Sequence, residues 1–86
     1  MTFDIDARWA LHPQVAVRTE PFGALLYHFG TRKLSFLKDT AVVEVVRSLS
    51  EHPTAGSALT AAGVADSAVH RKALVTLADS QMLVRL

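Results

Sequence analysis

Residue types that often carry out chemistry in proteins are present in this sequence, but their spacing favours neither a catalytic nor a metal site. Cysteine is absent, which excludes thiolate nucleophiles, disulfides and cysteine-bound iron–sulfur clusters within this chain. Serine, histidine and aspartate occur, yet none lies in a nucleophile-elbow pattern or beside a glycine-rich loop. The histidines share no i, i+4 spacing and no nearby carboxylate pair of the metal-binding kind; they are His12, His28, His52 and His70. We therefore expect a protein that is not an enzyme and holds no metal ion or cofactor.

The composition indicates one folded domain over residues 1–86. Half of the 86 residues are hydrophobic and 20% are charged, which excludes a disordered charged tail. The formal net charge of +1 provides no strong phosphate-neutralising surface, so nucleic acid is not the expected partner. The first residues include Asp4 and Asp6 without a basic segment, which is unlike a secretory signal. No apolar run approaches the about 20 residues that span a membrane, so we expect a cytoplasmic protein.

Alternating apolar residues predict three strands in the first half of the chain, over residues 15–18, 24–29 and 32–37. The second is apolar on both faces and is expected to be central. Gly30 and Thr31 supply a turn, so the second and third strands read as an antiparallel hairpin. The third strand would be an edge, whose unpaired backbone groups could template an incoming chain.

Several residues near these strands are expected to have a role in the fold. Phe22 and Gly23 are expected to form the entry to the second strand, where glycine permits a close backbone approach or a positive φ. Arg18 and Glu20 are expected to form a salt bridge. Trp9 could either cover the sheet or face a partner.

Apolar residues at three- and four-residue spacing predict three helices in the second half. The candidate N-caps are Asp39 or Thr40 for the first helix, Thr54 for the second, and Asp66 or Ser67 for the third. The first helix is expected to run to Leu49 and end before Pro53, and Gly63 is placed as the C′ residue of the second. Residues 83–86 read as a terminal extended segment. Three strands followed by three helices indicate a single α+β domain of winged-helix-like architecture.

That order resembles the PqqD-like peptide-recognition domain, and two sequence runs make the resemblance more specific. VRTEPFGALLY at residues 17–27 and RKLSFL at 32–37 closely resemble the mycofactocin-biosynthesis members of that group. The resemblance extends over nearly the whole chain from Trp9 onward, which leaves residues 1–8 as a segment that could be flexible. It departs at His52 and Pro53, where many PqqD-like domains have an acidic residue and glycine, so the turn there is expected to differ.

The resemblance implies a non-catalytic chaperone for a ribosomally made peptide. Members of this family bind the mycofactocin precursor peptide and dock a radical S-adenosylmethionine maturase, which carries the iron–sulfur clusters. The absence of cysteine agrees with a chain that leaves this chemistry to a partner.

We expect the leader peptide to add as a strand along residues 32–36, with the third helix walling the other side of a groove. The predicted peptide-binding residues are Arg32, Lys33, Leu34, Ser35, Phe36, His70, Arg71, Leu74 and Val75. A pocket lined by Leu34, Leu74 and Val75 would take an apolar anchor of the leader, although each of these apolar residues also reads as ordinary core. Basic residues could attract an acidic leader or simply form a solvated charged face; they are Arg32, Lys33, Arg71 and Lys72.

Two other functions remain open from the sequence. The three helices could form a winged-helix DNA-binding module in which residues 70–72 enter a major groove, although base-reading side chains are few. Alternatively, an exposed apolar patch could make the chain a structural or interaction subunit, including a homodimer.

Overall fold

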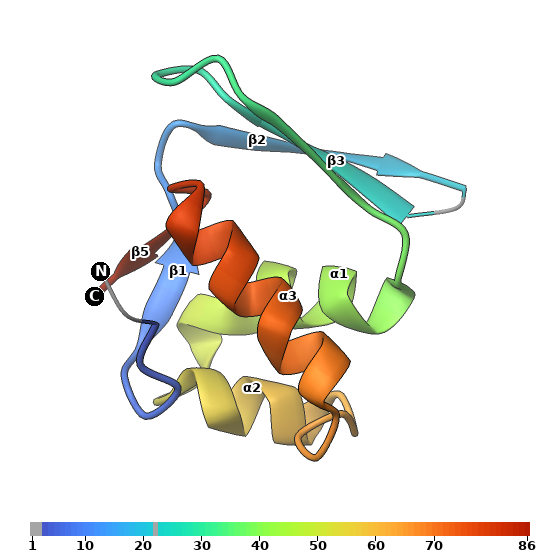
Figure 1. Ribbon diagram of the computed structural model, residues 1–86, viewed down its shortest axis with the longest axis vertical. Helices are drawn as coiled ribbons and strands as arrows, with labels where there is room; N and C mark the ends of the chain where they lie inside the picture. The colour runs from blue at the N-terminus through green and yellow to red at the C-terminus, as the bar shows by residue number, and fades with distance from the viewer. Residues whose placement is uncertain (1–2, 22) are drawn as a thin grey trace.

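The computed structural model describes residues 3–21 and 23–86 and arranges them as two antiparallel sheets and three α-helices (Figure 1). The strands are β1 (Trp9–Leu11), β2 (Val15–Glu20), β3 (Gly23–His28), β4 (Leu34–Leu37) and β5 (Leu83–Arg85). The helices are α1 (Thr40–Ser48), α2 (Ala55–Ala61) and α3 (Ala68–Asp79), with the short 3₁₀ helix η1 (Leu49–Glu51) between α1 and α2. The α+β class, with a three-stranded antiparallel sheet ahead of three helices, is confirmed.

The larger sheet has the order β2–β3–β4. Both pairings are antiparallel, and the register places Tyr27 of β3 between Ala16 of β2 and Leu34 of β4. The predicted central position of the second strand and edge position of the third are therefore confirmed.

The third strand of this sheet begins later than predicted. Residues 32 and 33 follow the turn at 29–31 and lie outside the strands, and β4 starts at Leu34. Arg32 has a positive φ of 62°, which ends an extended conformation, and its N–H donates to the carbonyl oxygen of His28 at 2.7 Å. The prediction that Arg32 and Lys33 belong to the strand is wrong, because alternation of side chains does not report the backbone geometry of a turn.

Gly23 fixes the spacing between β3 and β4. Its φ is +150°, and a Cβ at this position would collide with the backbone carbonyl of Leu37. Only glycine permits both the dihedral and this approach, which confirms the expected role of Gly23. The neighbouring Phe22 of the same prediction lies outside the described residues.

Each α-helix begins at a capping side chain that was among the N-cap candidates predicted from the sequence. Asp39 caps α1 by accepting the N–H groups of Ala41 and Val42, and Ser67 rather than Asp66 caps α3. Thr54 caps α2 in a reciprocal capping box. Gly63, with a φ of 75°, follows the last turn of α2 as its C′ residue. The longest of the described helices, α3, has 12 residues, and none of them combines the length and apolarity needed to cross a membrane.

A second, two-stranded sheet joins the two ends of the described chain. β1 pairs with β5 in register from Trp9 opposite Arg85 to Leu11 opposite Leu83. The terminal extended segment was predicted, but its pairing with residues 9–11 was not. Trp9 is 2% exposed, its indole N–H donates to the carbonyl oxygen of Asp4 at 2.7 Å, and its ring contacts that of Phe3. Trp9 therefore belongs to the core.

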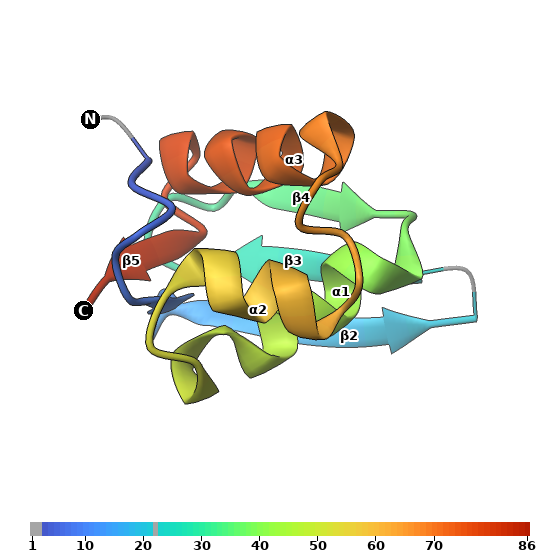
Figure 2. The same ribbon diagram turned by 90° about the horizontal axis from the view of Figure 1, so that it is seen from below.

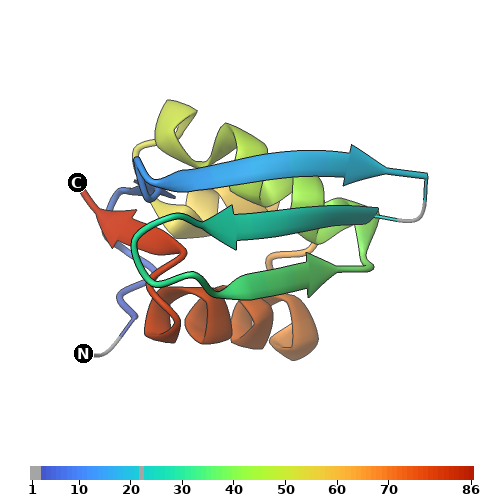
Figure 3. The same cartoon turned by 90° about the horizontal axis from the view of Figure 1, so that it is seen from above.

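The helices cover one face of the larger sheet and leave the other face open. Figures 1 and 2 show α1, α2 and α3 on the same side of β2, β3 and β4, and Figure 3 shows no described segment over the opposite face. Inward residues of β3 are buried in the core, including Ala24 and Leu26. Because side chains of a strand alternate between faces, Leu25 and Tyr27 belong to the uncovered side, which we call the outer face.

Candidate functional site

The strand β4 is an edge of the sheet that lies beside α3. It pairs with β3 on one side, and within residues 3–21 and 23–86 no strand pairs with it on the other. Figure 3 shows α3 running alongside this open side, and Figure 1 shows α3 below the level of the sheet. An extended segment entering there would meet strand backbone above and a helix flank below.

Hydrogen bonding in the hairpin determines which backbone groups of β4 face the open side. The N–H of His28 donates to the carbonyl oxygen of Lys33 at 3.0 Å. Bonded and non-bonded pairs alternate along an antiparallel ladder, so Ser35 and Leu37 direct their N–H and C=O groups toward β3. Leu34 and Phe36 direct theirs away from β3, toward the open side.

The side chains of β4 divide between the two faces of the sheet. Leu37 is buried and Ser35 is half-buried on the helix-covered side, whereas Leu34 and Phe36 are 61% and 44% exposed on the outer face. Leu74 of α3 is completely buried on the other side of the sheet. The expected pocket that joins Leu34 to Leu74 and Val75 is therefore not formed, because Leu34 and Leu74 belong to opposite faces.

The helix α3 turns only some of its predicted residues toward β4. His70 faces this direction, since its Nε2 lies 2.7 Å from Oδ2 of Asp39, just beyond the end of β4. Ala73, three residues on, shares the flank of His70. Arg71 and Val75 lie on the opposite flank, where they line a shallow hollow of about 370 Å³ together with Phe3, Ile5 and Ala68. The prediction that grouped Arg71 and Val75 with β4 is not supported by this placement.

Asp39, His70 and Ser67 form a hydrogen-bonded chain that ties the start of α1 to the start of α3. The Nδ1 of His70 lies 2.6 Å from the hydroxyl oxygen of Ser67. Partial burial alone would raise the pKa of Asp39, but the amide donors of Ala41 and Val42 and the contact with His70 together hold it below its ordinary value. The chain combines the residue types of a hydrolytic triad, but its acid and its hydroxyl are both helix caps, so we assign it to the fold.

His28 organises the turn that precedes β4, a role that the sequence interpretation missed. Its ring is 2% exposed, and Nδ1 accepts the N–H groups of Gly30 and Thr31 at 3.0 and 3.1 Å. Nδ1 of His28 therefore satisfies two backbone N–H groups of the turn. The position of His28 two residues before a Gly-Thr turn was the available sequence signal.

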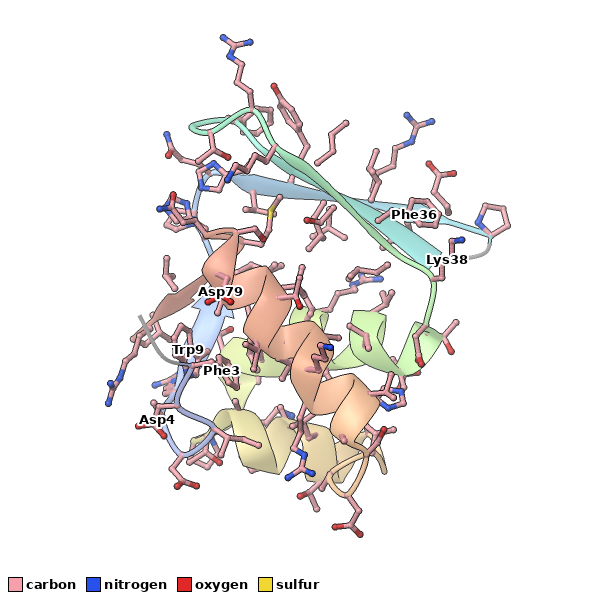
Figure 4. All side chains as sticks on the ribbon, in the orientation of Figure 1. Phe3, Asp4, Trp9, Phe36, Lys38 and Asp79 are labelled. Carbon is pink, nitrogen blue, oxygen red and sulfur yellow. The ribbon has the colours of Figure 1, made fainter. Side chains whose placement is uncertain are left out.

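A second cavity, of about 540 Å³, lies among β1, β5 and the end of α3. Phe3 and Trp9 form its aromatic side, and Asp79 lies at its α3 side. Figure 4 shows these three residues in a different part of the molecule from Phe36 and Lys38, which lie near the end of β4. None of the predicted peptide-binding residues lines this cavity.

Among residues 3–21 and 23–86, no three His, Cys, Asp or Glu side chains gather in a group that could hold a metal ion.

Comparison with known proteins identifies the family. Residues 8–84 match the sequence model of the Peptide chaperone MftB family. The chain is 67% identical to the Peptide chaperone MftB of Mycolicibacterium smegmatis, with 98% of this chain and 84% of the relative covered. It is 64% and 58% identical to proteins of the same name from Mycobacterium ulcerans and Mycobacterium tuberculosis, with 95% of this chain and 77% of each relative covered. No solved structure matches. The resemblance drawn from the runs at 17–27 and 32–37 is confirmed, and the chain belongs to the Peptide chaperone MftB family.

Proposed function

We propose that this chain binds the mycofactocin precursor peptide as an added strand along β4 and presents it to a radical S-adenosylmethionine maturase, without catalysing a reaction itself. The observation that supports this proposal is that β4 is an edge strand with a helix beside its open side. Strand addition uses such an edge because main-chain hydrogen bonds provide affinity that does not depend on sequence.

The expected energies show why the edge alone is insufficient. Each added ladder hydrogen bond contributes about 0.5 to 1.5 kcal/mol net, and ordering a flexible peptide costs about 2 to 5 kcal/mol. Burial of one apolar side chain of the peptide contributes about 1.5 to 3 kcal/mol. Apolar side chains of the peptide must therefore accompany the backbone pairing, and the exposed Leu34 supplies a surface for one of them.

The position of α3 supports the same mode of binding. The contact between Asp39 and His70 holds the first turn of α3 near the end of β4. Ala73 lies on the same flank of α3, one turn further along. An incoming strand would have small side chains, Ser35 and Ala73, on its helix side.

Calorimetric titration with the precursor peptide, followed by mapping of backbone amide shifts, tests the proposal. We expect saturable 1:1 binding and the largest shifts in Leu34–Leu37 and along the His70 flank of α3. Shifts confined to the cavity beside Trp9 and Asp79 would contradict strand addition along β4.

Two further measurements test the other parts of the proposal. The maturase is expected to modify the peptide faster in the presence of this chain than in its absence. A mobility-shift series with duplex DNA across salt concentrations is expected to show no binding at physiological salt, whereas steep salt-dependent binding without peptide affinity would favour a DNA-binding module.

A further inference from the structure

We propose that β4 selects a peptide whose apolar residues alternate along the added strand and lie on the outer face of the sheet, with acidic residues at both ends of that segment. This inference rests on the proposed function and specifies the chemistry of the peptide. It places the main apolar contacts on the uncovered face, instead of in a pocket between the sheet and α3.

The direction of the backbone groups sets the faces of the added strand. Leu34 and Phe36 turn their N–H and C=O groups to the open side, as the bond from His28 to Lys33 requires. In an antiparallel addition, the peptide residues opposite Leu34 and Phe36 form the bonded pairs. Directly opposed residues project to the same face, with Cβ atoms about 4.5 to 5.5 Å apart. Every second residue of the peptide therefore lies on the outer face.

The outer face contains two rows of side chains that end at β4. One row is apolar and runs from Ala16 through Tyr27 to Leu34, and the other runs from Arg18 through Leu25 to Phe36, with its apolar part next to the open edge. Leu34 and Phe36 retain 61% and 44% exposure at the ends of these rows. Apolar side chains on the added strand would extend each row by one residue and remove these side chains from water.

The opposite face of the added strand has different surroundings. Ser35 and Ala73 are both small and half-buried, and Leu74 behind them is already covered. The side chains of the peptide that point toward α3 therefore meet a surface with little exposed apolar area. The period-2 pattern that results, apolar outward and small or polar inward, distinguishes this edge from one that buries both faces of its guest.

Exposed lysine side chains lie at both ends of β4. Lys33 precedes the strand and Lys38 follows it, and both are exposed. The nearest carboxylate in the chain sequence, Asp39, is engaged with His70 and the start of α1. An acidic residue near each end of the added segment would complement these lysines.

Two synthetic peptides of equal composition test the pattern by calorimetry against the full chain. The alternating peptide has the core Glu-Thr-Val-Thr-Val-Glu, and the block peptide has the core Glu-Val-Val-Thr-Thr-Glu, each flanked by Gly-Ser segments. We expect the alternating peptide to bind about tenfold or more tightly than the block peptide, because it places two rather than one valine on the outer face. Replacement of both glutamates by glutamine should weaken it several-fold at low salt.

Matched variants of the protein locate the contact. Leu34→Thr keeps strand propensity and should weaken the alternating peptide by about tenfold. Leu25→Thr changes the same face one strand further from the guest and should change affinity by less than about threefold. Thermal unfolding of both variants establishes that they are folded.

The outcomes separate this inference from the proposed function. Equal binding of the two peptides, or no effect of Leu34→Thr, overturns the inference; if the precursor peptide still shifts Leu34–Leu37, strand addition itself stands. If the precursor peptide shifts no residue of β4, the proposed function fails and this inference fails with it. Concentration-dependent dimers in sedimentation that disappear in Leu34→Thr would assign the face to a second copy and also overturn it.

Discussion

The two edges of the larger sheet, β2 and β4, differ in the features that control strand pairing. β2 has six residues, bears an ion pair of Arg18 with Glu20 at 3.0 Å, and is followed by Pro21. β4 has four residues, with Leu34 exposed on its outer face. Charged side chains and proline protect an edge from unwanted pairing. The side chains of β2 therefore oppose pairing with an added strand more than those of β4 do, and this difference agrees with the proposed binding along β4.

The edges also differ in what anchors them. The ion pair on β2 joins two residues of the same strand. The contact of Asp39 with His70 joins the end of β4 to another element, α3. The geometry of β4 therefore depends on long-range contacts, and substitutions there should have consequences for both stability and binding.

Gly23→Ala is the largest expected disruption, because it acts where β3 meets the end of β4. The positive φ of Gly23 and the collision of a Cβ with the Leu37 carbonyl should lower the free energy of unfolding by about 2 to 4 kcal/mol. Chemical denaturation measures the change. Gly56→Ala is the matched control, since a Cβ there would meet atoms no closer than 3.5 Å. Gly56 lies in α2, so this variant should be neutral or slightly more stable.

Leu34→Pro against Thr19→Pro tests the comparison of the two edges directly. Both N–H groups point away from β3, as the bonds from His28 to Lys33 and from Phe29 to Gln14 indicate. Proline at position 34 removes a donor that the added strand would use, so precursor affinity should fall more than tenfold, at least about 1.4 kcal/mol. Thr19→Pro should leave affinity within about twofold if β2 takes no part.

One control variant and one contradicting outcome complete the test of the two edges. Leu34→Ala should lose only the side-chain contribution, so its affinity should lie between those of the wild type and Leu34→Pro. Equal loss of affinity in folded Thr19→Pro and Leu34→Pro variants would show that the two edges are not distinct.

Asp39→Asn should separate the charge of Asp39 from its capping role, because asparagine is also a good N-cap. The pKa of Asp39 is lowered in the folded protein, so its carboxylate stabilises the fold above the unfolded-state pKa. That contribution is lost as pH falls through the lower, folded-state pKa. Wild type should therefore be more stable than Asp39→Asn at pH 7 by a few tenths of a kcal/mol, because the side chain is 47% exposed.

The pH series provides the check for Asp39. Denaturation between pH 7 and pH 2 should show the difference between wild type and variant shrinking below about pH 4, the ordinary range of a carboxyl group. A difference that stays constant with pH would show that the carboxylate charge does not contribute.

The sequence was sufficient for the strands and caps that depend on local patterns. Alternation identified the central and edge strands, and Thr54 could be recognised as a cap because a side-chain acceptor precedes a helical run. The end of the hairpin turn could not be predicted in the same way. It depends on the ring of His28 accepting from Gly30 and Thr31, which alternation does not report.

Features that depend on tertiary placement were beyond the sequence patterns. The three residues of β1 are too few to show a period, and they are stabilised by pairing with β5 at the far end of the chain. Helical spacing places Arg71 and Val75 on one flank of α3, but the flank that faces β4 is set by the contact of His70 with Asp39. The candidate edge strand could therefore be predicted from the sequence, whereas the flank of α3 that faces it could not.

Glu20→Gln is the smallest expected effect and tests whether the two edges act independently. Glu20 accepts from Arg18, whose side chain is 79% exposed, so solvent screening should limit the loss of stability to about 0.5 kcal/mol or less. The pair lies on the β2 side of the sheet, with β3 between it and the added strand. Precursor affinity should therefore be unchanged in calorimetry at two salt concentrations. A several-fold change in affinity would mean that β2 communicates with β4 across the sheet, and the interpretation of β4 as an independent binding edge would then be wrong.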